Sequence, residues 1–328
     1  MIGRRTFIVG AGTAWAAAAA GAKAQQRSRM RRIGILNGFD NVISNDVRVK
    51  PFREELRALG WIEGENIQID YREVPNLTAL DAAAAELVAS KPEVIVVMPT
   101  PAIEAVKRAT QSIPVVFANT VAPVEGGFVA SLARPGGNMT GFTSMEYSLG
   151  GKWLELLKEF APATTRILVP FVKENYTSQG LLLSIEAAAQ SYGVSITAAA
   201  VHDADEIRRA FASFGRQEGS GLLTPPHTII TNNNRLIFQL ATDNRLVAVY
   251  PFRQYAVAGG LVAYGTVEAD AYRRAAGYVD RILKGEKPGN LPVQNPVRFE
   301  LVVNLRAAHA IGLSIPSSLL IRADEVIE

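Results

Sequence analysis

The sequence predicts an α/β protein of two similar, doubly wound, Rossmann-like lobes, and three observations lead to this prediction. An uninterrupted apolar run from Val94 to Met98, rich in β-branched residues, is typical of a strand buried on both faces of a parallel sheet. After this run, residues 102–110 have the composition of a helix. The alternation of strand and helix patterns restarts after Gly141. With 328 residues, the chain is also longer than a single core usually becomes.

The first half of the chain consists of repeated strand and helix patterns. Phe52, Leu56 and Leu59 have helical spacing, and Gly60 is expected to end their helix. Residues 67–71 alternate between apolar and polar side chains, which indicates a strand. We expect strands at 33–36, 67–71, 94–98 and 115–118, and helices around 52–59, 78–90 and 102–110.

The second half repeats this arrangement after a dense turn at residues 135–141. A helical stripe formed by Trp153, Leu156, Leu157 and Phe160 is interpreted as part of the core. Two similar halves imply two similar lobes, with a binding site between them. We expect strands at 167–169, 194–197, 222–223, 246–249 and 297–303, and helices around 181–191, 205–214, 233–243 and 268–284.

The chain is expected to pass between the lobes three times and so form a hinge. The turn at 135–141 leads into the first crossing, the flexible strand at 259–265 makes the second, and the strand at 297–303 makes the third. The expected ranges are 1–24 for a signal peptide, 31–143 and 266–290 for the first lobe, and 144–265 and 291–328 for the second.

The N-terminus reads as a secretory signal. Arg4 and Arg5 precede an apolar stretch at 7–20, and Ala22-Lys23-Ala24 forms a cleavage site, so we expect cleavage after Ala24. The paired arginines fit either an ordinary or a twin-arginine signal, and an uncleaved anchor is the alternative. The chain has no cysteine, which excludes lipid modification at the cleavage site. We therefore expect a protein that is free in the periplasm.

Charge argues against nucleic acid as a partner. The formal net charge is +3, but residues 1–24 hold three basic residues and no acidic ones, which leaves 31 of each in the rest of the chain. Nucleic-acid binding needs clustered Lys and Arg, and the sequence has no such cluster.

Polar residues follow three expected strands of the first lobe. Crossover connections place the carboxyl ends of parallel strands on one edge of the sheet, so these residues should converge. Thr100 begins the helix after the central strand, where unpaired N–H groups could hold a carboxylate, with Pro101 at its first helical position; the alternative is that Thr100 only caps this helix. The candidate site residues of the first lobe are Asn37, Phe39, Thr100, Pro101, Asn119 and Thr120.

Aromatic residues dominate the loops after the strands of the second lobe. Loops are poor places to bury aromatic rings for packing alone, so these rings favour a flat apolar ligand; packing between the lobes or at the surface is the alternative. His227 is either a ligand contact or a structural histidine, and Thr143 lies beside the first crossing. The remaining candidates are Thr143, Tyr176, His227 and Tyr250.

Motifs for catalysis and for cofactors are absent from the sequence. There is no GxxxxGK[ST] loop, no G-x-S-x-G, no cysteine, and no HExxH among the three histidines. We therefore expect neither an enzyme nor a metal or cofactor site.

Several stretches together resemble the tryptophan/tyrosine-transporter-like family of ABC transporter substrate-binding proteins. The resemblance covers most of the chain after residue 24 and ends in the closing Ala-Asp-Glu-Val-Ile-Glu. The matching stretches are 52–66 (FREELRALGWIEGEN), 91–102 (KPEVIVVMPTPA), 134–141 (RPGGNMTG), 258–265 (AGGLVAYG) and 278–292 (YVDRILKGEKPGNLP).

The resemblance implies a type I periplasmic binding fold, in which a ligand is held between hinged lobes and passed to a membrane permease powered by a separate ATPase. Thr100 matches the position where such proteins commonly hold a ligand carboxylate, and Asn37, Asn119 and Thr120 match neighbouring loops. The family usually has an acidic residue for an ammonium group after the strand at 222–223. Here residues 224–228 read Thr-Pro-Pro-His-Thr, without an acid, and this departure puts an α-amino acid ligand in doubt.

Affinity arguments favour a ligand with both a carboxylate and an apolar body. Micromolar binding needs roughly 8 kcal/mol, whereas a helix terminus supplies about 0.3–2 kcal/mol and a buried aromatic ring roughly 4–5 kcal/mol. We therefore expect a small aromatic or branched hydrophobic carboxylate, a class that includes the aromatic amino acids. A ligand-sensing periplasmic receptor of the same fold is the alternative function.

Overall fold

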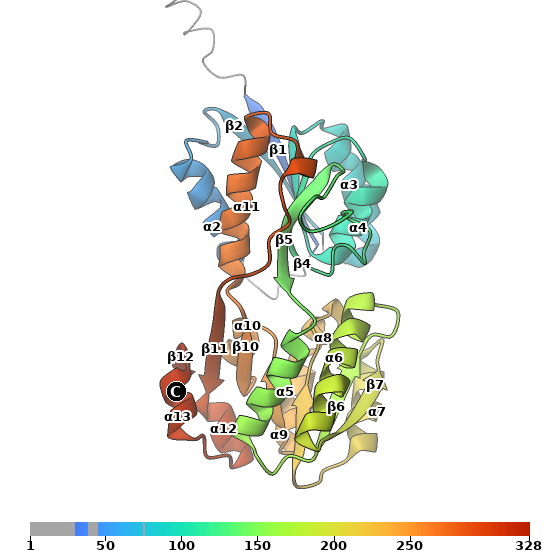
Figure 1. Ribbon diagram of the computed structural model, residues 1–328, viewed down its shortest axis with the longest axis vertical. Coiled ribbons are helices and arrows are strands. Elements are labelled where there is room, and N and C mark those ends of the chain that lie inside the picture. Colours follow the sequence, from blue (N-terminus) through green and yellow to red (C-terminus); the bar gives the residue numbers. More distant parts are fainter. Residues whose placement is uncertain (1–29, 39–44, 75) are drawn as a thin grey trace, which may run out of the picture.

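The computed structural model describes residues 30–38, 45–74 and 76–328, which form two α/β lobes stacked along the long axis of the molecule (Figure 1). The prediction of a two-lobed α/β fold is confirmed. The expected signal peptide at 1–24 and the candidate residue Phe39 lie outside the described residues. Within the described part of the chain, no helix combines the length and apolar character that a membrane span requires.

The first lobe contains a sheet of five parallel strands in the order β2-β1-β3-β4-β5. Side chains of the central strand alternate between two cores, with Val94 and Val96 on one face and Ile95 and Val97 on the other. This strand is thus buried on both faces, as its unbroken apolar run predicts. The strands are β1 (Arg31–Asn37), β2 (Ile67–Glu73), β3 (Val94–Met98), β4 (Val115–Val121) and β5 (Met139–Met145).

Helices cover both faces of this sheet. The short 3-10 turn η1 (Leu77–Ala79), α3 (Leu80–Ala89) and α4 (Thr100–Ala109) lie on one face, and α2 (Asn45–Ala58) and α11 (Glu268–Leu283) lie on the other (Figure 1). Although α11 is distant in sequence, it packs against α2 and the sheet. Its buried side includes Tyr272, Ala276 and Val279, which have the spacing of one helical face.

The second lobe contains seven strands in the order β12-β11-β10-β9-β8-β6-β7. Only the β10–β11 pair is antiparallel among these neighbours. Trp153 and Phe160 lie in its core, as their helical spacing predicts. The strands are β6 (Arg166–Phe171), β7 (Ser195–Ala200), β8 (Ser220–Leu223), β9 (Val247–Tyr250), β10 (Val262–Thr266), β11 (Phe299–Asn304) and β12 (Glu325–Ile327). The helices are α5 (Leu149–Phe160), α6 (Tyr176–Tyr192), α7 (Ala204–Phe214), α8 (Thr228–Asn232), α9 (Asn234–Asp243), α10 (Arg253–Val257), α12 (Leu305–Ile311) and α13 (Ser317–Arg322).

Three segments connect the lobes: the end of β5, the link from β10 to α11, and the chain after the 3-10 turn η2 (Pro288–Asn290) that leads to β11 (Figure 1). They are hydrogen-bonded to one another, because the Gln294 amide donates to the Gly141 carbonyl and the Val267 amide donates to the Arg298 carbonyl. The residue ranges of the lobes stay a prediction. Because Leu291 and Val293 pack into the cores of the first lobe, we propose to move the third boundary from 290 to after Val293.

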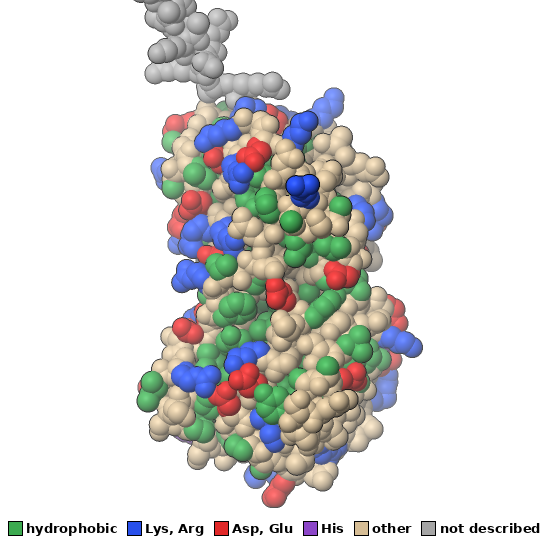
Figure 2. All heavy atoms as spheres, viewed as in Figure 1, with side chains coloured by type: hydrophobic (Ala, Val, Ile, Leu, Met, Phe, Trp, Pro, Cys, Tyr) green, Lys and Arg blue, Asp and Glu red, His purple; other side chains and the backbone are tan. Residues whose placement is uncertain are grey.

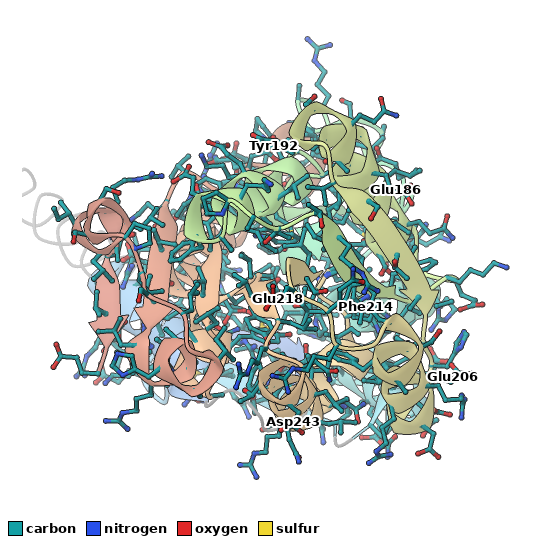
Figure 3. All side chains as sticks on the ribbon, turned by 90° about the horizontal axis from the view of Figure 1, so that it is seen from below. Glu186, Tyr192, Glu206, Phe214, Glu218 and Asp243 are labelled. Carbon is teal, nitrogen blue, oxygen red and sulfur yellow. The ribbon has the colours of Figure 1, made fainter. Side chains whose placement is uncertain are left out.

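The helices that follow β6 and β7 begin at the end of the second lobe that faces the first lobe. Figure 3 looks at the second lobe from below and labels Tyr192 and Phe214, the last residues of α6 and α7. Because each helix returns antiparallel to the strand before it, its first residues lie at the opposite end, where ligands bind in open α/β sheets.

Candidate ligand-binding cleft

A cavity lies between the lobes and is lined by residues of both. Its volume is about 90 Å³. One water molecule needs about 10–15 Å³ of such space, so the cavity holds on the order of six to nine waters, which is room for one small organic molecule. On the face seen in Figure 2, the molecule narrows at this level. The lining residues are Pro99, Thr100, Pro101, Asn119, Val121 and Ser144 from the first lobe and its crossing strand, and Asn175, Thr177, Pro226, His227, Thr228, Thr231 and Phe252 from the second.

The lining combines uncharged hydrogen-bonding groups with apolar surface. Among the described residues that line the cavity, none is an Asp, Glu, Lys or Arg. The described part of the chain also contains no group of three or more His, Asp or Glu that could hold a metal ion. The cavity therefore suits a ligand that is bound by dipoles and apolar contact.

Asn119 reaches the cavity because β4 is irregular at this point. The register of β4 against β5 shifts between Phe117 and Thr120, and Asn119 has a φ of 60°. A bulge of this kind re-aims a side chain, and asparagine tolerates the left-handed region better than most residues. The Asn119 Nδ2 donates to Oε1 of Glu268 over 2.9 Å, which fixes the orientation of the side-chain amide.

Thr100 begins α4 but is not its N-cap, in contrast to one interpretation of the sequence. The N-cap is Pro99, and Thr100 is the first helical residue, without a capping hydrogen bond from its side chain. Its Oγ1 forms a 2.9 Å hydrogen bond with Oγ1 of Thr120, whose side chain is fully buried beneath it. The amides of Ala102 and Ile103 donate to the Pro99 carbonyl. The start of α4 therefore has fewer free donors than an open helix terminus would have.

His227 is a neutral side chain in the cavity wall. Burial lowers the pKa of its imidazole to about 4. Its Nδ1 accepts a 3.1 Å hydrogen bond from the Ile229 amide and so caps α8. Because Nδ1 acts as the acceptor, the neutral ring carries its proton on Nε2, which makes His227 a hydrogen-bond donor.

Tyr176 bridges the lobes and does not line the cavity. Its hydroxyl lies against Gly126 in the loop between β4 and β5, where an added Cβ would come within 2.6 Å of it. Burial, followed by the negative charge of Glu104, raises the pKa of this hydroxyl to about 12. The neighbours of Tyr176 in sequence, Asn175 and Thr177, are the residues that face the cavity.

Tyr250 is corrected from a candidate site residue to a core residue. It is only 1% exposed and stacks on Tyr255 with ring centroids 5.7 Å apart. As the last residue of β9, it points into the core of the second lobe, and the aromatic residue that lines the cavity is Phe252. Asn37 is also buried away from the cavity, where its Nδ2 donates to the Tyr71 hydroxyl.

Thr143 lies beside a smaller hollow near the hinge. Its Oγ1 donates to Oδ1 of Asn295 over 2.9 Å. This hollow shares Asn119 and Ser144 with the main cavity and is also lined by Glu268. Four of the sequence-predicted residues, Thr100, Pro101, Asn119 and His227, therefore line the main cavity.

Sequence reasoning missed most of the contribution of the second lobe. Asn175 and Thr177 follow β6 in the same way that Thr100 follows β3, so the rule that selected Thr100 could have found them. Ser144 and Thr231 have no comparable sequence signal, because they reach the cavity through the crossing strand and through α8. The residues missed are Pro99, Val121, Ser144, Asn175, Thr177, Pro226, Thr228, Thr231 and Phe252.

A buried charged cluster adjoins this site and involves both lobes. Arg48 of α2 and Glu268 of α11 form an ion pair at 3.6 Å, with their side chains 1% and 5% exposed. Gln254 of α10 donates from Nε2 to Oε2 of Glu268 over 3.1 Å. Glu268 is therefore held from the first lobe by Arg48 and Asn119, and from the second lobe by Gln254.

The family model for ABC transporter substrate binding proteins matches residues 41–327 of this chain. The chain belongs to this family. Its members bind substrates for transporters and do not transform them, so this is a binding protein and not an enzyme. The resemblance inferred from the sequence is thereby confirmed.

Individual relatives agree with this assignment. A tyrosine-binding protein of Clostridioides difficile (strain R20291) is 25% identical over 308 residues, covering 92% of this chain and 88% of the relative. A conserved domain protein from Vibrio cholerae superposes with a TM-score of 0.84 at 24% identity, covering 91% of this chain and all of that one. A Streptococcus pneumoniae ABC domain in complex with L-Trp gives a TM-score of 0.83 at 23% identity, with the same two coverages. Other solute-binding proteins share the two-lobed type I fold.

Proposed function

We propose that this protein is the periplasmic substrate-binding component of an ABC importer, and that it captures a small aromatic or branched hydrophobic carboxylate between its lobes. The observation that carries the proposal is the interlobe cavity itself. It joins uncharged donors, such as Thr177 and His227, with the apolar surface of Phe252 and Val121. Ligand pockets typically have this composition, mostly apolar with a few convergent polar groups.

An aromatic amino acid is the first ligand to test. One relative is named for tyrosine binding, and one similar structure contains L-Trp. No described carboxylate lines the cavity, and both Oε atoms of the nearby Glu268 are already hydrogen-bonded. We therefore expect the carboxylate and the apolar body to contribute more to affinity than the ammonium group.

Delivery to a membrane permease with a separate ATPase follows from the same proposal. The N-terminal segment serves as the export signal and places the protein in the periplasm. The ligand-binding residues that we propose from the sequence set are Thr100, Pro101, Asn119 and His227, with Thr120 supporting Thr100 from below.

Closure of the lobes around the ligand is the proposed mechanism. Two contacts between the lobes lie next to the cavity: Gln254 with Glu268, and Tyr176 with Gly126. Ligand binding favours the closed state only through contacts that the open state lacks, and these two flank the space where the ligand would lie. Small-angle scattering tests this, because saturating ligand should reduce the radius of gyration.

The deciding experiment is native mass spectrometry of the purified mature protein, followed by calorimetry with a ligand panel. The panel contains L-tyrosine, L-tryptophan, L-leucine and 3-(4-hydroxyphenyl)propanoate, with tyramine and arabinose as controls. We expect the carboxylates to bind with micromolar or better affinity and the two controls not to bind. Binding of arabinose but of no carboxylate would refute the proposed ligand class.

A further inference from the structure

We infer that the ligand carboxylate binds to the second lobe, at the start of α6, and that Thr100 in the first lobe is not its main partner. This inference rests on the proposed function, because it assumes a carboxylate ligand in the interlobe cavity. It assigns the anion to Thr177, in the first turn of α6, together with His227, the N-cap of α8. Both residues line the cavity, and the Tyr176 amide precedes Thr177 in the same turn.

The start of α6 has unused backbone donors. This helix is 17 residues long, and Asn175 caps it by accepting the Ser178 amide on Oδ1 over 2.8 Å. The Gln179 amide donates to the Asn175 carbonyl. Within the described residues, the amides of Tyr176 and Thr177 have no hydrogen-bond acceptor, as expected for the first turn of a helix. Two N–H groups at the positive end of the helix dipole therefore lack an acceptor, and one of them belongs to Thr177, which lines the cavity.

The Thr177 hydroxyl is a second, independent indication. Thr177 is 6% exposed and lines the cavity, and among the described residues its Oγ1 has no hydrogen-bond partner. The Tyr176 hydroxyl lies near it, but the two do not reach hydrogen-bonding geometry. A buried hydroxyl without a partner is costly in a folded protein, and such groups call for a functional explanation. A ligand oxygen at this position would satisfy it.

His227 adds a donor on the same side of the cavity. Its Nδ1 is occupied by the Ile229 amide, so the ring offers Nε2–H, and His227 and Thr177 line the same cavity. Glu174, two residues before α6, is hydrogen-bonded to His202. The other negative charges near the start of α6 are Glu104 and Glu125 of the first lobe, which raise the pKa of the Tyr176 hydroxyl. Neither of them lines the cavity.

The first lobe presents a different set of groups. The Thr100 hydroxyl already shares a hydrogen bond with Thr120, Pro101 has no N–H, and the next two amides of α4 donate to Pro99. Within the described residues, the first turn of α4 therefore has one amide without an acceptor, that of Thr100, whereas the first turn of α6 has two. Asn119 donates one N–H of its Nδ2 to Glu268, and its Oδ1 can only accept. This wall suits a hydroxyl or ammonium group of the ligand better than its carboxylate.

The test compares the Thr177→Val and Thr100→Val variants, using L-tyrosine and its neutral analogue L-tyrosinamide as probes. We expect Thr177→Val to weaken L-tyrosine binding about ten- to a hundredfold, because the lost hydrogen bond involves a charged group, and to change L-tyrosinamide binding much less. Thr100→Val should affect the two probes alike. Unchanged L-tyrosine affinity in Thr177→Val, or loss of the preference for acid over amide in Thr100→Val alone, would overturn the inference.

The stability of the ligand-free variant separates a binding role from a structural one. Because the Thr177 hydroxyl has no partner in the described protein, its replacement by the similarly shaped valine should leave the melting temperature unchanged or raise it. A lowered melting temperature together with unchanged affinity would show that the hydroxyl is structural and that the inference is wrong.

A probe that does not depend on the natural ligand distinguishes this inference from the proposed function. Titration with 2-methylpropanoate, followed by backbone amide NMR, should shift the Tyr176 and Thr177 resonances saturably and the Thr100 resonance less. If neither α6 amide shifts, the carboxylate subsite is refuted. If both shift but none of the larger carboxylates binds the wild-type protein, the proposed ligand class fails and the subsite stands.

Discussion

His227 should make the protein less stable in mild acid. Burial lowers its pKa from 6.5 to about 4 in the folded protein. Between these values the unfolded chain binds more protons than the folded one, so the free energy of unfolding falls as the pH falls. The stabilising effect of the neutral imidazole is complete above pH 6.5 and is lost as the pH approaches 4. The difference of about 2.5 pH units corresponds to about 3 kcal/mol.

The matched variant is His227→Asn, which cannot titrate. An asparagine Oδ1 can take the place of Nδ1 as acceptor for the Ile229 amide, so the cap of α8 is kept. We would measure urea unfolding by tryptophan fluorescence at pH 7 and pH 4.5 for the wild type and the variant. Other carboxylates also titrate in this range, so the quantity of interest is the difference between the two proteins. We expect this difference to shift in favour of the variant by about 2–3 kcal/mol at the lower pH.

Direct titration provides the control. The chain has three histidines, so their ring protons can be assigned by single substitutions and followed by NMR. His227 should titrate far below His202, whose pKa is raised by hydrogen bonds to Glu206 and Glu174. The reasoning would be refuted if His227 titrated near 6.5, or if the stability difference between the wild type and His227→Asn did not depend on pH.

Three further predictions concern the hinge, the surface and the ligand. Gly141→Ala should lower the free energy of unfolding by about 3 kcal/mol or more in urea titrations, because the new Cβ would lie 2.0 Å from the Phe117 carbonyl oxygen. Gly137→Ala is the control: no atom lies within 4 Å of its new Cβ, so the free energy of unfolding should change little. His202→Gln should lower the melting temperature below pH 6.5, where the raised pKa of His202 contributes to stability. This effect should vanish as the pH rises through the pKa of His202 in the folded protein. An equal decrease in melting temperature at pH 6 and pH 9 would contradict the prediction. Phe252→Leu should weaken the binding of aromatic ligands about two- to tenfold in calorimetry, whereas Tyr250→Phe in the core should leave the affinity unchanged. The opposite result would show that Tyr250 belongs to the binding site.

The two-lobed architecture could be predicted from the sequence because its signals are local and strong. The run Val94–Met98 specifies a strand buried on both faces whatever surrounds it, and the side chains of β3 do face two cores. Helical spacing identified the buried stripe of α11. Parallel strands joined by helices must end on one edge, which brought Thr100 and Asn119 to the same cavity.

What tertiary structure decided is which side chain of each loop faces the ligand. The strand β9 ends at Tyr250, whose side chain packs into the core. The chain then turns into α10, and this turn brings Phe252, the N-cap of α10, to the cavity. The register shift in β4 that directs Asn119 leaves no mark in the pattern of apolar residues.

The donors of the cavity were likewise decided only in three dimensions. Thr100 and Thr177 are both hydroxyl residues in the first turn of a helix, although only Thr100 was selected from the sequence. The Thr100 hydroxyl is hydrogen-bonded to Thr120, 20 residues later, whereas no described group is hydrogen-bonded to the Thr177 hydroxyl. Hydrogen bonding depends on distances between chain segments that composition and periodicity do not contain. The sequence by itself therefore determined the family, the two lobes and the edge at which they meet, and the packing of the lobes determined which polar groups there remain free for a ligand.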